Sequence, residues 1–187
     1  MARGVVSGHG VQAALLRAVN VGTRKVPMAR LRELMAADGF ADVRTYLQSG
    51  NVVFADGGRG PADNGARLEK LLLEEFGFPV ECVMRTVEQM DAVIAANPLP
   101  HRVPDFKKYV VTFFDAAPDP ALVGALKAED FAPDEFVFAG DELYTWSPEG
   151  VHTSKFTQQF LTRKLGVRVA TGRNWNTVLK LRELAAG

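Results

Sequence analysis

Two polar segments, each next to a predicted strand, hold the residue types best suited to binding a ligand. Residues 20–25 read Asn-Val-Gly-Thr-Arg-Lys and lie between an apolar strand and a helix predicted to begin at Pro27. Unpaired N–H groups and the dipole at a helix N-terminus favour an anion, and Arg24 and Lys25 add positive charge. The segment is not a Walker A sequence, so no preference for nucleotides follows. A simple turn is an equally good interpretation of the segment.

The second segment, Gln48-Ser-Gly-Asn51, lies between β-branched and aromatic runs that predict a hairpin with a two-residue turn. In a split βαβ unit, the strands before and after the helix run parallel, so both segments leave the sheet at the same edge. Arg173 and Asn176 open the last predicted helix and join this edge only if the second half of the chain docks there. The candidate residues for binding an anion are Arg17, Asn20, Gly22, Arg24, Lys25, Gln48, Ser49, Asn51, Arg173 and Asn176.

Other kinds of site lack the patterns that they need. Ser49 has no local base and no Gly-x-Ser-x-Gly motif, which argues against a serine nucleophile. The three histidines are not spaced as metal ligands, so no metal site is expected. The single cysteine, Cys82, falls in an apolar strand pattern that favours a buried, inert thiol. Trp175 shares its helix spacing with Val178 and Leu179, which predicts a core position. No cofactor follows from these residues.

The composition is typical of a soluble globular protein, with 47% apolar and 24% charged residues among 187. No signal peptide and no membrane-spanning run is visible, so a cytoplasmic protein without membrane contact is expected. The net charge is zero, but residues 1–35 hold six Lys or Arg and residues 150–182 hold seven, whereas acidic residues dominate the middle. These basic ends either form one patch for anions or belong to a solvated mosaic with no shared face.

Hydrophobic periodicity predicts the same order of elements twice, separated by three prolines between Asn97 and Asp105. Each half is expected to be a ferredoxin-like βαββαβ subdomain followed by an extra helix, which makes an α+β protein. A single mixed sheet is the alternative. The expected parts are a flexible N-terminus at 1–10, an N-terminal α/β subdomain at 11–97, a linker at 98–107 and a C-terminal α/β subdomain at 108–187. The predicted strands are 11–19, which should be central because both of its faces are apolar, and 43–48, 51–55, 80–84, 108–114, 135–138, 142–146 and 167–170.

Three stretches, Ala14-Leu-Leu-Arg-x-x-Asn-Val-Gly22, Thr45-Tyr-x-Gln-Ser-Gly-Asn-Val-Val-Phe54 and Thr171-x-Arg-Asn-Trp-Asn-Thr-Val-x-Lys-Leu181, span nearly the whole chain. Together with the pair Ser154-Lys155, they resemble the motifs of the bacterial DUF1697 family, whose activity is not established. The resemblance implies two α/β subdomains of ferredoxin-like character. Ala18 and Thr23 stand where the family usually has glycine, so the first loop is expected to be stiffer in this chain.

These observations favour a protein that binds an anionic ligand, such as a phosphorylated metabolite, a nucleotide or a nucleic acid. One alternative is an enzyme that acts on a phosphorylated small molecule, with Arg17, Arg24 or Lys25 as electrostatic groups. The other alternative is an interaction or oligomerisation module without a small ligand.

Overall fold

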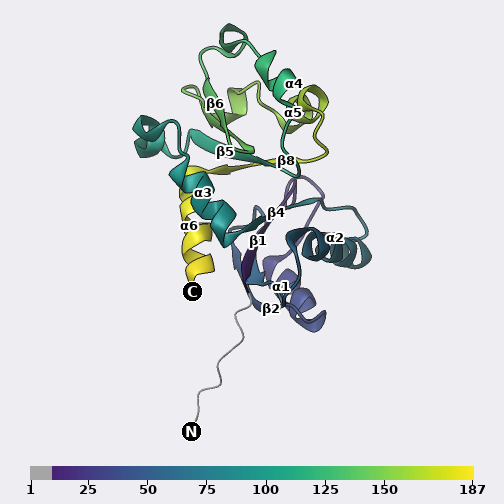
Figure 1. Ribbon diagram of the computed structural model, residues 1–187. Helices are drawn as coiled ribbons and strands as arrows, with labels where there is room; N and C mark the ends of the chain where they lie inside the picture. The colour runs from purple at the N-terminus through teal and green to yellow at the C-terminus, as the bar shows by residue number, and fades with distance from the viewer. Residues whose placement is uncertain (1–9) are drawn as a thin grey trace.

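The computed structural model describes residues 10–187, so the predicted flexible terminus lies outside the described residues except for Gly10. Both halves show the predicted order of elements (Figure 1). The first half contains β1 (Val11–Leu16), α1 (Met28–Ala37), β2 (Ala41–Tyr46), β3 (Asn51–Ala55), α2 (Pro61–Phe76), β4 (Cys82–Thr86) and α3 (Val87–Ala95). The second half contains β5 (Tyr109–Phe114), α4 (Pro120–Gly124), β6 (Glu135–Ala139), β7 (Glu142–Trp146), α5 (Gln158–Leu165), β8 (Ala170–Asn174) and α6 (Trp175–Ala186). Short 3-10 helices lie at Pro100–Asp105, Ala128–Phe131 and Val151–Thr153.

Each half forms its own four-stranded antiparallel sheet, in the orders β2-β3-β1-β4 and β6-β7-β5-β8. These are the strand orders of a ferredoxin-like sheet, and the prediction of two such subdomains is confirmed. The strand β1 is central, as predicted, with Ala13 opposite both Val53 and Arg85. Both β1 and β2 run antiparallel to β3, so they point in the same direction. The C-terminal ends of β1 and β2 therefore lie at the same edge of the first sheet.

A shared core joins the two sheets. The helices α3 and α6 lie side by side at one face of the first sheet (Figure 1), and they bury Met90 and Trp175 among side chains of both sheets. Trp175 stacks on Tyr109 with ring centroids 5.4 Å apart and is only 4% exposed, which confirms its structural position. Leu179 is instead 40% exposed, because the buried face of α6 runs through Val178 and Leu181 and leaves Leu179 on its flank.

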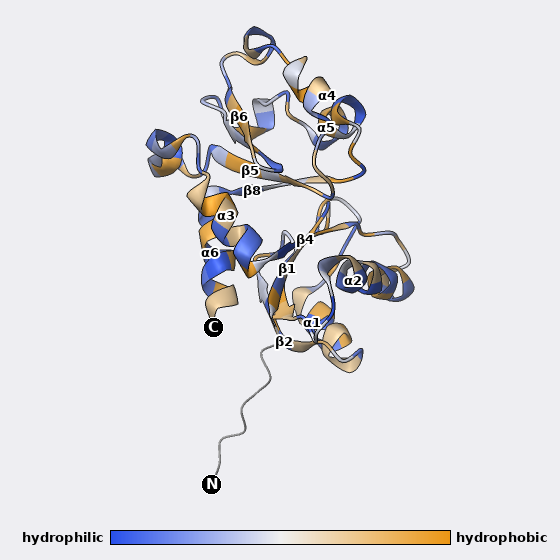
Figure 2. Ribbon diagram, viewed as in Figure 1, coloured by the Kyte–Doolittle hydropathy of each residue, from blue (hydrophilic) through white to orange (hydrophobic). Residues whose placement is uncertain are grey.

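Two further layers cover the outer faces of the sheets. The helices α1 and α2 pack on the first sheet over Leu16 and Phe54. The shorter helices α4 and α5 pack on the second sheet over Phe114 and Leu143, with extra aromatic rings such as Phe156 filling the space. Figure 2 shows hydrophilic and hydrophobic residues alternating along α2 and α6, as expected for helices with one face in a core.

Several predicted boundaries shift for local reasons. The strand β1 ends at Leu16 rather than at residue 19, because Ala18 and Asn20 have φ angles of 52° and 56° that an extended strand does not accommodate. The loop between β2 and β3 has four residues instead of two, with Leu47 at a φ of 59°. The spacing of apolar residues predicts a helix over 154–165, but α5 begins at residue 158, because the Thr157 side chain caps it there.

The last strand also moves. The structure pairs β5 with residues 170–174, so β8 follows the predicted segment 167–170 instead of coinciding with it. The sequence Thr86-Val-Glu-Gln89 predicts a capping box, and this box is present at the start of α3. Asp63 and Asn64 are the N-caps that the sequence suggests for the preceding helix, but α2 already begins at Pro61, because Gly60 supplies the extended backbone before the first turn.

Candidate functional site

The two predicted polar segments are in direct contact at the edge where β1 and β2 end. The side-chain amide of Asn20 donates to the carbonyl oxygen of Gln48 at 2.6 Å. The same side chain closes its own loop, because it donates to the carbonyl of Val26 at 2.9 Å and accepts from the Val26 N–H at 3.0 Å. These bonds hold the loop against the hairpin and occupy the amide of Asn20.

The arginines of this edge are engaged within the protein. Arg17 donates from Nε to Oε1 of Gln158 at 2.7 Å and forms an ion pair with Glu81 at 3.3 Å. Arg24 donates from Nη2 to the carbonyl oxygen of Pro79, and its buried Nε has no hydrogen-bond partner within residues 10–187. The predicted residues with exposed positions are Gly22, Lys25, Gln48, Ser49 and Asn176.

The second half docks against this edge and brings Arg173 to it. Arg173 is 7% exposed, and it donates to Oδ1 of Asn51 at 2.5 Å and to the carbonyl of Leu16 at 2.8 Å. Burial away from water lowers the pKa of Arg173 to about 10. All five N–H groups of its guanidinium have acceptors, the others being on Thr171, Gly172, Ser49 and Gly50.

The first half sends an arginine across the same interface in the opposite direction. Arg85 is 7% exposed, and its Nε donates to Oε1 of Glu142 at 3.0 Å. Its Nη2 donates to the carbonyl of Phe114 at 2.9 Å. Burial raises the pKa of Glu142, although the positive charge of Arg85 opposes the shift.

The two crossings occupy equivalent places in the two subdomains. Each arginine is the residue before the N-cap of the helix that follows the last strand of its subdomain. Glu142 begins β7 as Asn51 begins β3, and Phe114 ends β5 as Leu16 ends β1. Each half therefore inserts the same residue into the same place in the other half.

A cleft of about 550 Å³ opens beside Arg85, between α2 and the loop that follows β5. Small side chains create this space, because α2 presents Ala62, Gly65 and Ala66 to it and the loop presents Ala117. Arg85 itself lines the cleft. At the equivalent place in the first half, Arg17 follows β1 and extends its long side chain to α5.

Two hydrogen-bond donors of Arg85 are not used within the described residues. Its guanidinium has five N–H groups, of which three are used, the third donating to the carbonyl of Met84 at 2.8 Å. The other two, one on each terminal nitrogen, have no acceptor within residues 10–187. Gln89 also lines the cleft, and its Oε1 accepts from the Thr86 N–H at 2.9 Å, which leaves its amide N–H groups for a ligand.

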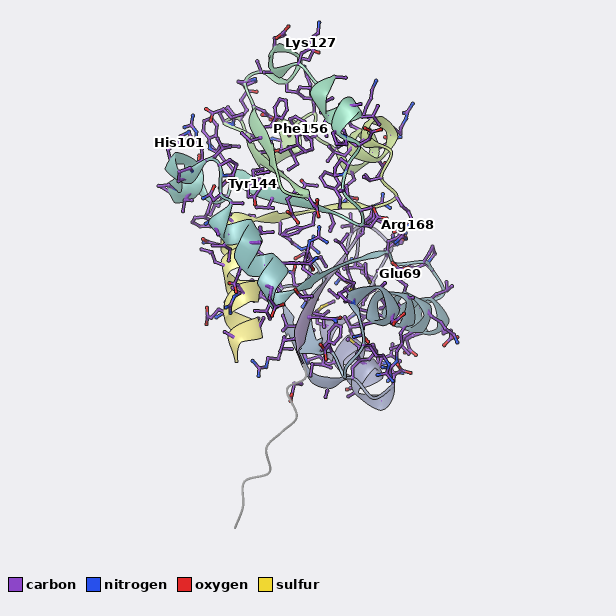
Figure 3. The ribbon with its side chains drawn as sticks, viewed as in Figure 1. Glu69, His101, Lys127, Tyr144, Phe156 and Arg168 are labelled. Atoms are coloured by element: carbon purple, nitrogen blue, oxygen red, sulfur yellow. The ribbon has the colours of Figure 1, made fainter. Side chains whose placement is uncertain are left out.

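Arg168 connects the two halves at the side of the cleft. Its Nε lies 3.2 Å from Oδ2 of Asp115, and its Nη2 lies 3.6 Å from Oε1 of Glu69 on α2. Figure 3 shows Glu69 and Arg168 near each other where the halves meet. Both carboxylates also accept backbone N–H groups, Asp115 from Val169 at 2.9 Å and Glu69 from Cys82 at 2.8 Å. These acidic side chains are thus largely occupied by protein donors.

Residues 10–187 contain no cluster of three or more His, Cys, Asp or Glu side chains that could hold a metal ion. Burial raises the pKa of the Cys82 thiol, as expected for an inert side chain. Among the same residues, no helix has the length and apolar character needed to cross a membrane.

Sequence reasoning missed the polar groups of the cleft, Arg85, Gln89 and Arg168. The strand that carries Arg85 reads as apolar, and the capping box after it explained Gln89 fully. One signal was present, because an arginine directly precedes the N-cap both before α3 and, at Arg173, before α6. The repetition marks the two sites as equivalent.

The fold and the two arginine crossings define a class of α+β protein with two interlocked ferredoxin-like subdomains. The model of the family described as "Protein of unknown function (DUF1697)" matches residues 11–144, and the chain therefore belongs to the DUF1697 family. The resemblance seen in the sequence motifs is confirmed. No protein with a curated description matches the chain.

A solved structure shares the fold. It is that of the conserved bacterial protein SP0830 from Streptococcus pneumoniae, which is 23% identical to this chain. The two superpose with a TM-score of 0.74, and the match covers 95% of this chain and 99% of that one. At this level of identity, the likeness extends to the fold and not to a function.

Proposed function

We propose that this protein binds a small anionic molecule in the cleft beside Arg85. The observation that carries the proposal is the pair of N–H groups of Arg85 that have no acceptor within residues 10–187. Arg85 lines the cleft, so these two N–H groups are available to a molecule that enters it. A planar fork of N–H groups matches the oxygens of a carboxylate or a phosphate. A ligand oxygen in the cleft would accept hydrogen bonds from them.

Other donors support an anionic group in the same place. The helix α2 begins at the cleft with no side-chain cap, and Ala62 in its first turn lines the wall. Pro61 has no N–H, and Asp63 places a carboxylate in the same turn, so this contribution is smaller than that of Arg85. The first N–H groups of a helix and its dipole favour a negative charge. The amide of Gln89 adds a neutral donor, and Arg168 adds a second cation at the side of the cleft.

The acidic residues of the cleft limit the charge of the ligand. Glu142 pairs with Arg85, and Glu69 and Asp115 pair with Arg168. Asp141 also lines the cleft and is exposed. Since only two cations face these groups, a phosphate monoester or a carboxylate fits better than a polyphosphate.

A thermal-shift screen tests this proposal. The panel contains inorganic phosphate, phosphate monoesters, nucleoside mono- and triphosphates and short oligonucleotides, because a bound ligand raises the melting temperature by mass action. We expect shifts from monoesters and weaker shifts from triphosphates, followed by affinities from calorimetry. No shift from any member at millimolar concentration would overturn the proposal.

Two tryptophan variants locate the site. Ala117 is exposed and lines the cleft, so Ala117→Trp should fill the opening and abolish binding without loss of stability. Ala37 is exposed at the end of α1, outside the cleft, and Ala37→Trp is the matched control. Equal affinity in the two variants would place the ligand elsewhere.

The basic loop at residues 20–25 is a second candidate site. The observation that favours it is the buried positive charge of Arg173, which has only neutral acceptors among the described residues. Two of these acceptors are the backbone carbonyls of Ser49 and Gly50 in the hairpin loop. Lys25 and Gln48 are exposed at this edge. A ligand held here would lose affinity and salt dependence in Lys25→Ala and keep both in Ala117→Trp. A ligand held in the cleft would instead keep its affinity in Lys25→Ala and lose it in Ala117→Trp.

The same screen separates the remaining functions. An enzyme that acts on a phosphorylated small molecule would turn over one of the ligands that stabilise the protein. An interaction module would show no ligand shift and would form a stable oligomer. We place the protein in the cytoplasm on the strength of its sequence alone.

A further inference from the structure

A second hollow of about 460 Å³ continues the cleft along α2. The two hollows share Ala66, Glu69 and Arg168 in their walls, so they adjoin at the contact between Arg168 and Glu69 (Figure 3). Each volume is by itself within the range of about 300–1,000 Å³ that is typical of sites for small molecules. The contact between Arg168 and Glu69 therefore lies at the boundary between the two hollows.

The second hollow differs from the first in its chemistry. Apolar side chains of Leu73, Pro79 and Val80 form much of its wall. Leu73 is 48% exposed on α2, which is high for a large apolar residue next to a groove. One of its acidic residues, Glu81, already forms an ion pair with Arg17. Lys70 also lines the second hollow, where its ammonium lies 3.8 Å from the carboxylate of Glu74 and its side chain is 76% exposed. The buried donors for an anion therefore lie in the first hollow, and Leu73 and Pro79 give the second hollow its apolar surface.

We infer that the ligand is an amphiphile, with an anionic group against Arg85 and an apolar chain that passes Arg168 to reach Leu73. This inference rests on the function proposed above. The occupant is a single free molecule, because the anion-binding donors lie on a buried arginine inside a cleft rather than on an outer surface. Contact with the apolar wall removes hydrocarbon from water, which adds affinity in proportion to the area covered.

Arg168 stands at the boundary between the two hollows and is suited to move. Its side chain is 58% exposed, and the 3.6 Å separation of its Nη2 from Glu69 makes that contact weak. Its shorter contact, 3.2 Å, is with Asp115 on the side of the first hollow. A turn of the guanidinium toward the anionic group would open the passage and add a donor to that group.

A series of alkyl phosphates tests the inference by calorimetry. Methyl, butyl and octyl phosphate carry the same anionic group, and octyl phosphate is used below the concentration at which it aggregates. Full burial of a methylene corresponds to about a fourfold gain in affinity, so an open groove should give roughly twofold per carbon. We expect octyl phosphate to bind at least tenfold more tightly than methyl phosphate.

Leu73→Ser locates the chain. This variant should flatten the dependence on chain length and leave the affinity for methyl phosphate unchanged. Leu122 is 40% exposed on α4, away from both hollows, and Leu122→Ser is the matched control that should keep the full dependence. A chain-length dependence that survives in Leu73→Ser would overturn the inference.

The outcomes distinguish this inference from the proposed function. If methyl phosphate fails to bind, the anion site itself is wrong. If methyl phosphate binds and octyl phosphate binds no better, only the amphiphile is wrong. Equal binding of octylamine would show that the charge of the head group is not recognised, and Leu73-dependent sedimentation with phosphatidylglycerol vesicles would show a membrane surface instead of a free ligand. Either of these two results would overturn the inference.

Discussion

The two places where the subdomains interlock have the same architecture and different contents. Arg173 crosses to the first half and is saturated by neutral oxygens, whereas Arg85 crosses to the second half, meets a carboxylate and keeps two donors free. The residue after the central strand differs as well, because Arg17 reaches the opposite helix in one case and the shorter Asp115 stands in the other. A repeated fold can thus saturate the arginine at one joint and leave free donors on its counterpart at the other.

The largest expected effect comes from removing the arginine that faces a carboxylate. Arg85→Ala leaves Glu142 buried without its partner, which should cost about 3–5 kcal/mol of unfolding free energy. Urea denaturation of the single variant and of Arg85→Ala/Glu142→Gln measures the coupling, and we expect the second change to restore part of the loss. At the other joint, Asn51→Ala should give no such rescue of Arg173→Ala, since Asn51 carries no charge. Equal rescue at both joints would contradict the distinction.

Conservative substitutions should separate structure from binding. Lysine keeps the charge but not the planar fork, so Arg173→Lys should cost about 2 kcal/mol, because several carbonyl groups lose their donor. Arg85→Lys should cost less stability and instead remove affinity for the phosphate monoesters found in the screen. Denaturation and calorimetry on both variants check this, with exposed Arg163→Lys on α5 as the control. The comparison fails if Arg85→Lys binds normally.

The unfolding free energy measured as a function of pH should distinguish the Arg85–Glu142 joint, which contains a titratable carboxyl group, from the Arg173–Asn51 joint, which does not. The pKa of Glu142 is raised in the folded protein by burial. A raised folded pKa contributes stability below the unfolded pKa, and this contribution is lost as the pH rises through the folded value. As the pH rises above the ordinary glutamate pKa of 4.5, the wild type should therefore lose stability relative to Glu142→Gln. Parallel unfolding curves for the two proteins above this pH would show that Glu142 does not titrate as expected.

The smallest expected effect lies in the first loop. Ala18 has a φ angle of 52°, a conformation that costs a residue with a Cβ about 1–2 kcal/mol. After the entropy that glycine loses on folding, Ala18→Gly should still stabilise the protein by about 0.5 kcal/mol. Thr23 is not among the non-glycine residues with positive φ, so Thr23→Gly should be neutral or destabilising. Thermal denaturation compares the two, and equal shifts would argue against strain at Ala18.

Much of the fold could be predicted because it depends on local patterns. Alternation and helical spacing set the order of elements, and the shared direction of β1 and β2 predicted the contact between the Asn20 loop and the Gln48 turn. The glycine that the motif resemblance led us to expect at position 18 would suit the left-handed backbone there. Boundaries moved where a cap such as Thr157 or a positive φ decided them.

The candidate site was harder to predict, because it depends on how the halves pack. Whether Arg173 reaches the first edge follows from the placement of α6, which no local pattern encodes. Arg17 and Arg24 read as available cations, but Glu81 and the carbonyl of Pro79 engage them from other elements. The cleft exists because Ala62, Gly65 and Ala66 on α2 have small side chains or none. In the sequence, alanine and glycine in a helix give no indication of a cleft.

Because Arg85 and Arg173 insert reciprocally, the contacts between the two halves of this chain resemble those of an isologous dimer. In a two-fold dimer, each subunit offers its partner the same side chain and the same socket. Here residues 97–108 connect the two halves covalently, so they always occur together. The two places that receive Arg85 and Arg173 can therefore differ in sequence. Produced as separate chains cut within that connection, the two halves should complement each other and assemble as a heterodimer, since each lacks the arginine that completes it.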